Sequence, residues 1–291
     1  MKILSFDLKL VVLVFIVLLF FASNSILARM AIFTQNIDAF SFTFLRIISA
    51  MVILLFIYFY KNKKIKIDFK NNYISGFMFF LYAICFSYSY INMAAGIGTL
   101  ILFAVVQLTM IILALFLNEK LTLKKFIGIT IAFGGLVYLL YPKDDFTISY
   151  FHAFLMFLSA IGWAIFSVLG KKSNNATLNA TDSFVKAFIF TIFFAIFYLF
   201  FFENSLKIDF PTFIMAITSG SITTAFGVFI WYSILPKMQI MTASIIQLIV
   251  PIIAIILSVI FLNETFTFEL FISTIIILFG IFIALYKKRK I

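Results

Sequence analysis

The chain has 291 residues, of which 65% are hydrophobic and 11% are charged, and its mean hydropathy is +1.20. Because soluble domains carry about 25% charged residues, this composition excludes a water-covered surface and predicts an integral membrane protein. The formal net charge of +11 would suggest nucleic acid as the partner of a soluble protein, but here the positive residues fall in short loops and predict membrane orientation instead.

Apolar stretches of about 20 residues, the length that crosses a bilayer, recur along the whole chain. The first of them also has features of a signal peptide, since Lys2 precedes it and Ser23-Asn24-Ser25 offers small residues at cleavage spacing. We prefer a retained span, because removal would leave nine. The ten expected spans are Leu8–Leu27, Phe40–Tyr60, Tyr73–Ile91, Ala95–Leu117, Leu123–Leu140, Tyr150–Leu169, Ser183–Phe202, Thr212–Leu235, Met241–Leu262 and Glu269–Tyr286.

The distribution of lysine and arginine predicts the orientation of these spans. With the N-terminus inside, the expected cytoplasmic segments hold 18 of these residues, and the outer segments hold 3: Arg29, Lys143 and Lys207. Cytoplasmic loops are enriched in positive residues, so we expect a multi-pass protein of the cell inner (plasma) membrane with both termini in the cytoplasm. No connection is long enough for a soluble catalytic domain.

Part of the first half of the chain returns in the second half. Leu117-Asn118-Glu119 recurs as Leu262-Asn263-Glu264, and Gly135 recurs as Gly280 in the same register. Polar residues at fixed spacing within apolar sequence indicate a duplication, with repeats at 1–142 (spans 1 to 5) and 143–291 (spans 6 to 10). Because each repeat has an odd number of spans, the second is predicted to lie upside down, as in many secondary transporters.

Several short motifs follow one another in a fixed order. They are Phe21-Ala22-Ser23-Asn24, the Phe42–Ala50 stretch with Arg46, Gln107-Leu108-Thr109-Met110, Leu117–Thr122, Gly134–Tyr138, Gly162-Trp163-Ala164, Gln247–Pro251 and Leu262-Asn263-Glu264. Together they resemble the drug/metabolite transporter superfamily, in particular its ten-helix permeases with two EamA-type repeats. Asn118 and Asn263 depart from the pattern, since glycine is usual there. The resemblance implies an all-α integral membrane protein of two inverted five-helix repeats, with export as the typical direction.

Polar side chains inside a span are candidates for function, because burying them in lipid is costly. We expect Arg46 to attract an anionic group such as a carboxylate; the alternative is snorkelling to the headgroups or a bond to helix-end carbonyls. For Lys186, near the start of its span, we prefer this alternative. Helix contacts are the alternative for hydroxyl groups, and packing is the alternative for aromatic rings. The substrate-binding candidates are Asn24, Arg46, Tyr82, Ser89, Gln107, Trp163, Thr224, Trp231 and Gln247.

Three further residues are interpreted as hinge or structural elements. Pro251, in the middle of span 9, frees a backbone carbonyl and permits a kink. Glu119 and Glu264 each precede a helix start, where a carboxylate bonds free N–H groups; a gate or a proton-linked carboxylate is the alternative. No aspartate or glutamate falls near the middle of a span, so the sequence shows no buried, proton-relaying carboxylate and does not identify the coupling ion.

The sequence therefore predicts a secondary-active transporter of small amphipathic metabolites, amino acids or related compounds, that works by alternating access. Export is preferred and import is the alternative. An intramembrane enzyme is disfavoured, because one His, one Cys and no mid-span acid supply no usual catalytic set, and a non-transport receptor would lack loops for partners. We expect no metal and no cofactor. The expected partners are a small-molecule substrate and the lipid bilayer, not nucleic acid, and a homodimer is left open.

Overall fold

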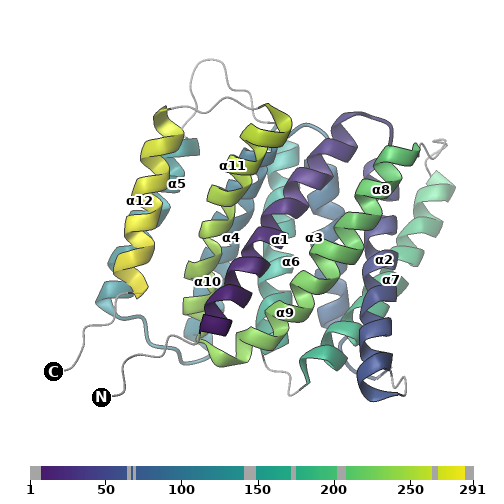
Figure 1. Cartoon of the computed structure of the whole chain (residues 1–291), viewed down its shortest axis with the longest axis horizontal. Coiled ribbons are helices and arrows are strands. Elements are labelled where there is room, and N and C mark those ends of the chain that lie inside the picture. Colours follow the sequence, from purple (N-terminus) through teal and green to yellow (C-terminus); the bar gives the residue numbers. More distant parts are fainter. Residues whose placement is uncertain are drawn as a thin grey trace.

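The computed structural model describes residues 8–63, 67, 70–140, 149–171, 175–201, 208–263 and 268–285 (Figure 1). Within these ranges the regular secondary structure is helical, apart from one isolated bridge between Ile37 and Ile208. The elements in chain order are α1 (Leu8–Phe33), α2 (Ala39–Asn62), α3 (Tyr73–Ser89), α4 (Ala95–Phe116), α5 (Leu123–Leu140), α6 (Tyr150–Lys171), α7 (Ala176–Phe201), α8 (Phe210–Thr218), the π-helix η1 (Ser219–Phe226), α9 (Gly227–Ile234), the short 3₁₀ helix η2 (Leu235–Lys237), α10 (Ile240–Gln247), α11 (Ile249–Leu262) and α12 (Phe268–Leu285).

The helices have the length and composition of membrane spans. Seven helical stretches in the described residues are long and apolar enough to cross a bilayer, and two shorter apolar helices, at Tyr73–Ser89 and Phe271–Ala284, accompany them. Large hydrophobic side chains remain exposed along their outer faces, which suits contact with lipid rather than water. This confirms the predicted α-helical, multi-pass membrane protein.

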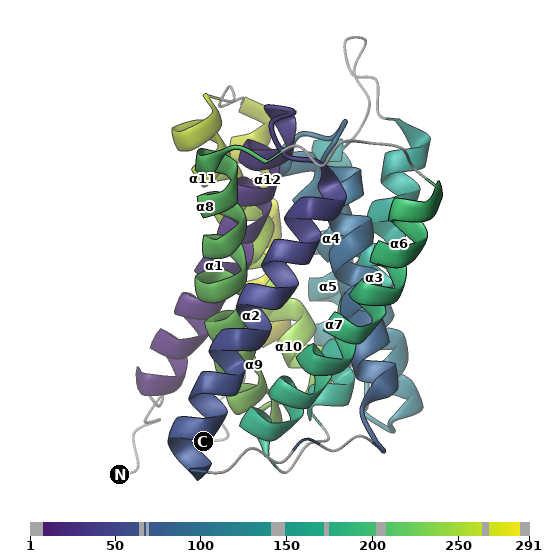
Figure 2. The ribbon, with the colours of Figure 1, turned by 90° about the vertical axis from the view of Figure 1, so that its right-hand side faces the viewer.

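The helices stand side by side and run up and down across one bundle (Figure 1). Helix α1 begins and α12 ends at the same side, the lower one in Figure 1, which we call the terminal side; the opposite one is the distal side. Figure 2 shows the same alignment of the helices after a quarter turn. Helices α5 and α12 pack together at one edge of the bundle, and α2, α7 and α8 lie toward the other.

Close backbone contact holds the α5–α12 pair together. A Cβ atom added at Gly128 would lie 2.5 Å from the carbonyl oxygen of Gly280, and one added at Gly280 would lie 2.5 Å from the backbone nitrogen of Ala132. Small residues allow helix backbones in membranes to approach and gain van der Waals contact. The two glycines therefore set the distance between these helices.

Two asparagines at helix ends, Asn118 and Asn263, adopt the left-handed backbone conformation. Asn118 has a φ of 61° and Asn263 a φ of 53°, in the left-handed region that glycine adopts without strain. Asparagine enters this region more readily than other side chains. Replacement of the usual glycine by asparagine therefore preserves both turns.

The largest error in the predicted spans concerns α7, which begins at Ala176 and not at Ser183. The polar residues before Ser183 resemble a loop in sequence. In the structure the side chain of Asn175 accepts a hydrogen bond from the N–H of Leu178 at 3.0 Å, and Thr181 donates to the carbonyl oxygen of Leu54 at 3.3 Å. The polar groups are satisfied against neighbouring helices, so the helix continues through them. Helix α1 likewise extends six residues beyond the predicted Leu27, to Phe33.

Candidate functional site

A buried cluster of polar side chains surrounds Arg46 in the interior of the bundle. Arg46, from α2, is 1% exposed. Its Nε donates a hydrogen bond to Thr224 Oγ1 at 3.0 Å, and its Nη2 donates to the Tyr82 hydroxyl at 2.9 Å. The guanidinium carbon also lies 5.1 Å from the ring centre of Tyr82 and 5.0 Å from that of Phe86. The predicted snorkelling alternative for Arg46 is therefore wrong.

The positive charge of Arg46 has no negative partner within the described part of the chain. The ion pairs there join Lys171 to Glu119 and Lys186 to Asp182, and the Nη1 atom of Arg46 makes no hydrogen bond. Burying an ion costs several kcal/mol, whereas a cation over aromatic faces recovers about 0.5–2 kcal/mol. The site therefore holds an arginine whose charge the surrounding rings and hydroxyls offset only in part.

Asn24 of α1 fixes the hydroxyl groups that face Arg46. Its Oδ1 accepts hydrogen bonds from Ser219 at 2.8 Å, Thr223 at 2.5 Å and Thr224 at 3.3 Å. Thr224 in turn accepts from Arg46. One amide thus connects α1, η1 and α2 through a continuous chain of hydrogen bonds.

The π-helix η1 brings these hydroxyls close to α2. A Cβ atom at Gly220 would overlap the carbonyl oxygen of Arg46 and the hydroxyl of Ser49, so only glycine fits at this contact. Single turns of π-helix inside α-helices are frequent at functional sites. The sequence predicted one unbroken span here, because the wider hydrogen-bond pattern of a π-helix leaves no signature in apolar periodicity.

Aromatic rings extend the cluster away from Arg46. Tyr82 lies 5.0 Å from Trp163, and Trp163 lies 4.8 Å edge-on from Phe21. Phe21 also contacts Trp231 at 5.8 Å. The indole N–H of Trp163 donates to Gln247 Oε1 at 2.9 Å. The cluster therefore has a polar end at Arg46 and an aromatic wall that reaches α10.

Gln247 lies at the break between α10 and α11. Its Nε2 donates to the Ala243 carbonyl at 3.3 Å and approaches the Met110 sulfur at 3.3 Å. The helix is interrupted at Leu248, one turn before Pro251, whose nitrogen cannot donate to the carbonyl of Gln247. The structure thus places a break where Pro251 predicted a kink.

Two predicted residues stand apart from this hydrogen-bonded chain. Gln107 of α4 is 0% exposed, and neither amide atom has a hydrogen-bond partner; it lies one helical turn from Met110, which contacts Gln247. Ser89 instead donates to the Cys85 carbonyl of its own helix at 2.7 Å. Within the described residues Ser89 makes no hydrogen bond to the Arg46 cluster, and Gln107 approaches that cluster only through Met110.

Glu119, in the turn between α4 and α5, connects this turn to α6 and α10 on the terminal side. Its Oε1 accepts from the Ile240 N–H at 2.7 Å and from Lys171 Nζ at 3.2 Å, and its Oε2 accepts from the Met241 N–H at 3.1 Å. Burial raises the pKa of the Glu119 carboxyl, but these three donors stabilise its charged form, so the net pKa lies below its ordinary value. The predicted capping role falls on a different helix: Glu119 caps α10, from the other half of the chain, and not α5. Glu264 lies outside the described residues.

Lys186 and Asp182 form a second buried charged group, which the sequence did not predict. Lys186 is 0% exposed and Asp182 is 1% exposed, and Lys186 Nζ lies 3.9 Å from Asp182 Oδ1. The predicted snorkelling of Lys186 is wrong. The error follows from starting span 7 at Ser183, which left Asp182 in a loop and Lys186 at a helix end.

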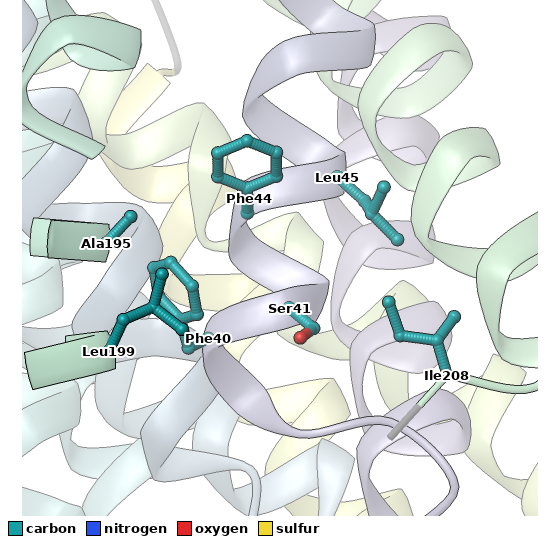
Figure 3. A pocket seen from close by; sticks show the side chains of 7 residues that line it. All are labelled: Phe40, Ser41, Phe44, Leu45, Ala195, Leu199 and Ile208. Carbon is teal, nitrogen blue, oxygen red and sulfur yellow. The ribbon is translucent and has the colours of Figure 1, made fainter. Parts of the chain in front are cut away.

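An apolar cavity of about 330 Å³ lies between α2 and α7, near the distal side (Figure 3). Ser41 supplies the one polar side chain of its lining, and its hydroxyl already donates to Asp38. The cavity does not coincide with the Arg46 cluster. Its lining residues are Phe40, Ser41, Phe44, Leu45, Ala195, Leu199 and Ile208.

The sequence profile of the EamA-like transporter family matches this chain twice, at residues 8–141 and at residues 151–286. The chain belongs to the EamA-like transporter family. It is 30% identical over 275 residues to an uncharacterized protein of Pseudomonas aeruginosa, with 94% of each chain covered. It is 28% identical over 219 residues to the uncharacterized transporter YetK of Bacillus subtilis, covering 72% of this chain and 66% of that one.

A further relative and a solved structure are also similar to this EamA-like protein. An uncharacterized transporter of Archaeoglobus fulgidus is 25% identical over 202 residues, covering 68% of this chain and 70% of that one. A solved crystal structure superposes with a TM-score of 0.75 at 15% identity, covering 95% of this chain and 97% of that one, which shows a shared fold. Together with the apolar helices, the family identifies a multi-pass membrane transporter.

Proposed function

We propose that this protein is a secondary-active carrier of small amphipathic metabolites, amino acids or related compounds, and that the Arg46 cluster binds the substrate. The observation that carries the proposal is a buried guanidinium with no carboxylate partner among the described residues and with Nη1 unbonded. EamA-like transporters are generally not enzymes, and the proposed cycle contains no catalytic step.

The chemistry around Arg46 fits a solute with one carboxylate and an apolar body. Guanidinium binds carboxylate through two parallel, charge-assisted hydrogen bonds, and one arginine balances one negative charge. The adjoining rings of Tyr82, Trp163 and Phe21 offer an apolar surface, whose faces also attract an ammonium group. A zwitterion such as an amino acid meets both parts.

The proposed carrier has ten spans in two inverted repeats, at 1–142 and 143–291. In this interpretation α8, η1, α9 and η2 together form one span, and α10 with α11 forms another. The double match of the family profile, at residues 8–141 and 151–286, supports the duplication, and the left-handed Asn118 and Asn263 close equivalent helices. Inverted repeats can exchange conformations, which is the basis of alternating access.

The broken α10–α11 segment is the proposed moving element. Its start is bound on the terminal side by Glu119, which also holds Lys171 of α6. Gln247, beside its break, bonds Trp163 of the proposed site. We propose that Pro251 permits the hinge, and that release of the Glu119 contacts opens the terminal side. We place the terminal side on the cytoplasmic face of the inner membrane, which the lysine and arginine bias favours, and propose export as the direction.

Counterflow in liposomes tests the proposed function. Purified protein, reconstituted with a panel of unlabelled amino acids and related metabolites inside, is given the same radiolabelled compounds outside. Transient, saturable accumulation of one compound class is expected, and the R46Q variant should lose it. A folded wild-type protein that exchanges none of the panel would contradict the proposal. Initial rates from the two sides of oriented vesicles then separate export from import.

A further inference from the structure

The buried pair of Asp182 and Lys186 is the one charged group of α7 that the proposed substrate site does not use. The two residues lie one turn apart on the same helix face. Both side chains are almost fully buried, and their charged atoms are 3.9 Å apart. This distance satisfies an ion pair but exceeds that of a hydrogen bond.

Helix α3 covers the pair from the side. Asn72, which precedes α3, donates its amide to Asp182 Oδ2 at 3.4 Å, and the Tyr73 ring lies 5.8 Å from Lys186 Nζ. A Cβ atom at Gly76 would overlap the Cβ of Lys186. The carboxylate is therefore shielded by close packing between α7 and α3.

Other titratable groups approach this region from the helices packed around it. Lys61 of α2 donates to Thr177 of α7 at 3.5 Å. Tyr232 of α9 donates its hydroxyl to the Phe166 carbonyl at 3.0 Å and also bonds Ser75, which in turn accepts from Ser183 at 2.8 Å. Hydroxyl groups thus link the neighbourhood of Asp182 to α3 and α9.

The depth of Asp182 allows exchange of protons with water on the terminal side. Helix α7 has 26 residues, or about 39 Å at 1.5 Å per residue, and exceeds the hydrocarbon thickness of about 30 Å. Asp182 follows the first residue of α7 by six positions, or about 9 Å. It therefore lies just inside the hydrocarbon region and close to the aqueous boundary.

The pair is poorly explained as a stabilising feature. A buried ion pair is often no more stabilising than apolar residues of similar volume, and ionisable residues inside membrane proteins commonly belong to proton relays. Lys186 already places a cation beside the carboxylate. A proton, which neutralises the carboxylate directly, is therefore better suited to Asp182 than a sodium ion, which would compete with the ammonium group.

We propose that Asp182 is the proton-binding site that couples transport to a pH gradient. In the exchange, a proton taken up from the distal side neutralises the Asp182 carboxylate, which removes its attraction for Lys186 and loosens α7 from α3. The proton is released to the aqueous phase on the terminal side as the solute leaves in the opposite direction. The signal reaches the substrate site through α3: Phe184 of α7 lies 4.1 Å from Phe79, and Phe79 lies 5.5 Å from Tyr82. This inference rests on the proposed carrier function.

The test uses the double variant D182N/K186Q, because replacing Asp182 alone would leave a buried lysine without its carboxylate. The matched control is D209N, which makes the same acid-to-amide change at a helix cap on the distal side. Infrared difference spectra of the purified protein in lipid, recorded as pH is lowered, report the protonation of carboxylates. With only 11 acidic residues in the chain, the contribution of one residue can be resolved. The carboxylic-acid band of wild type and D209N should contain a component that is missing from the band of the double variant. An unchanged band in the double variant would overturn the proposal.

Transport then separates this inference from the proposed function. In liposomes loaded with a solute from the counterflow panel, the double variant should keep counterflow. In empty liposomes, it should lose the accumulation of that solute that a proton gradient drives. A sodium gradient should drive accumulation in neither protein. Absence of counterflow in wild type would overturn the carrier function and the coupling with it. Counterflow in both proteins, with an undiminished response of D182N/K186Q to the proton gradient, would overturn the coupling alone.

Discussion

Two cations, Arg46 and Lys186, are fully buried in the described part of this protein, and their surroundings differ. Lys186 has Asp182 one turn away on the same helix, with charged atoms 3.9 Å apart. Arg46 is surrounded by hydroxyls and aromatic rings, without a carboxylate partner in the described residues. The difference indicates that the counter-charge of Lys186 is built into the fold, whereas that of Arg46 is left for a ligand.

The two sites also differ in the helices that position them. The Arg46 site is assembled from α1, α2, α3 and the π-helix η1, and it continues to the break in α10. The Asp182–Lys186 pair lies within α7 and packs against α3. Helix α3 is common to both, so it is the element through which a change in one can reach the other.

Removal of the Arg46 charge should have the largest effect on transport. R46Q keeps a hydrogen-bonding side chain but loses the charge-assisted pair with a carboxylate, so we expect counterflow to fall about 10²-fold, equivalent to about 2.7 kcal/mol. R46K, which keeps the charge but not the planar fork, should lie between R46Q and wild type. Equal activity of R46Q and wild type, at matched levels of folded protein in gel filtration, would contradict the assignment.

The close contact of η1 with α2 should make Gly220 the most sensitive glycine for stability at the Arg46 site. The Cβ of G220A would overlap backbone and hydroxyl oxygens of Arg46 and Ser49, so we expect a loss of about 1–3 kcal/mol. The matched control is G134A, because no atom lies within 4 Å of its added Cβ and alanine favours a helix by about 0.5–1 kcal/mol. Thermal unfolding in detergent should rank G134A at or above wild type and G220A below it. The reverse order would be inconsistent with the packing described.

An internal carboxylate beside Arg46 should convert this site into one that resembles the Lys186 pair. T224D places a negative charge at the atom that now accepts from Arg46 Nε. The affinity for a carboxylate solute should then fall about tenfold, or about 1.4 kcal/mol, measured as the half-saturating concentration in counterflow. T224N is the neutral control of the same size. If both variants weakened binding equally, charge competition would not be the cause.

The Glu119 contacts should show the smallest effect, as a dependence of stability on pH. The pKa of Glu119 is lowered in the folded protein from its ordinary value of 4.5. Its contacts therefore stabilise the fold above that value and are lost as the pH falls through the lower, folded-state pKa. Near neutral pH, wild type should unfold at a higher temperature than E119Q, which corresponds to a free energy of unfolding about 1 kcal/mol larger. This difference should shrink below pH 4.5. A pH-independent difference would exclude this role.

Features that depend on local composition could be predicted from the sequence. Apolar stretches of membrane-spanning length predicted the helical membrane fold, and rare polar residues within them pointed to Asn24, Arg46, Tyr82 and Thr224, which the structure joins by hydrogen bonds. The cost of burying a polar group in lipid makes such residues informative by themselves.

Features that depend on tertiary contacts were missed. Asp182 lies in a polar run that resembles a loop, and only packing against α2 and α3 shows it to be helical and buried. The helix that Glu119 caps lies in the other half of the chain, so no local pattern could name it. Ser89 has the spacing of a cavity residue, but its hydroxyl is satisfied within its own helix.

The most direct test of the central claim, that Arg46 awaits the carboxylate of a solute, is competition between matched compounds in the wild-type protein. For each amino acid that shows counterflow, the corresponding amide, which has the same body but no negative charge, is added as a competitor. The account predicts that the acid competes and that the amide competes far more weakly, and that R46Q abolishes this preference. Equal competition by acid and amide in wild type would show that Arg46 does not bind the carboxylate.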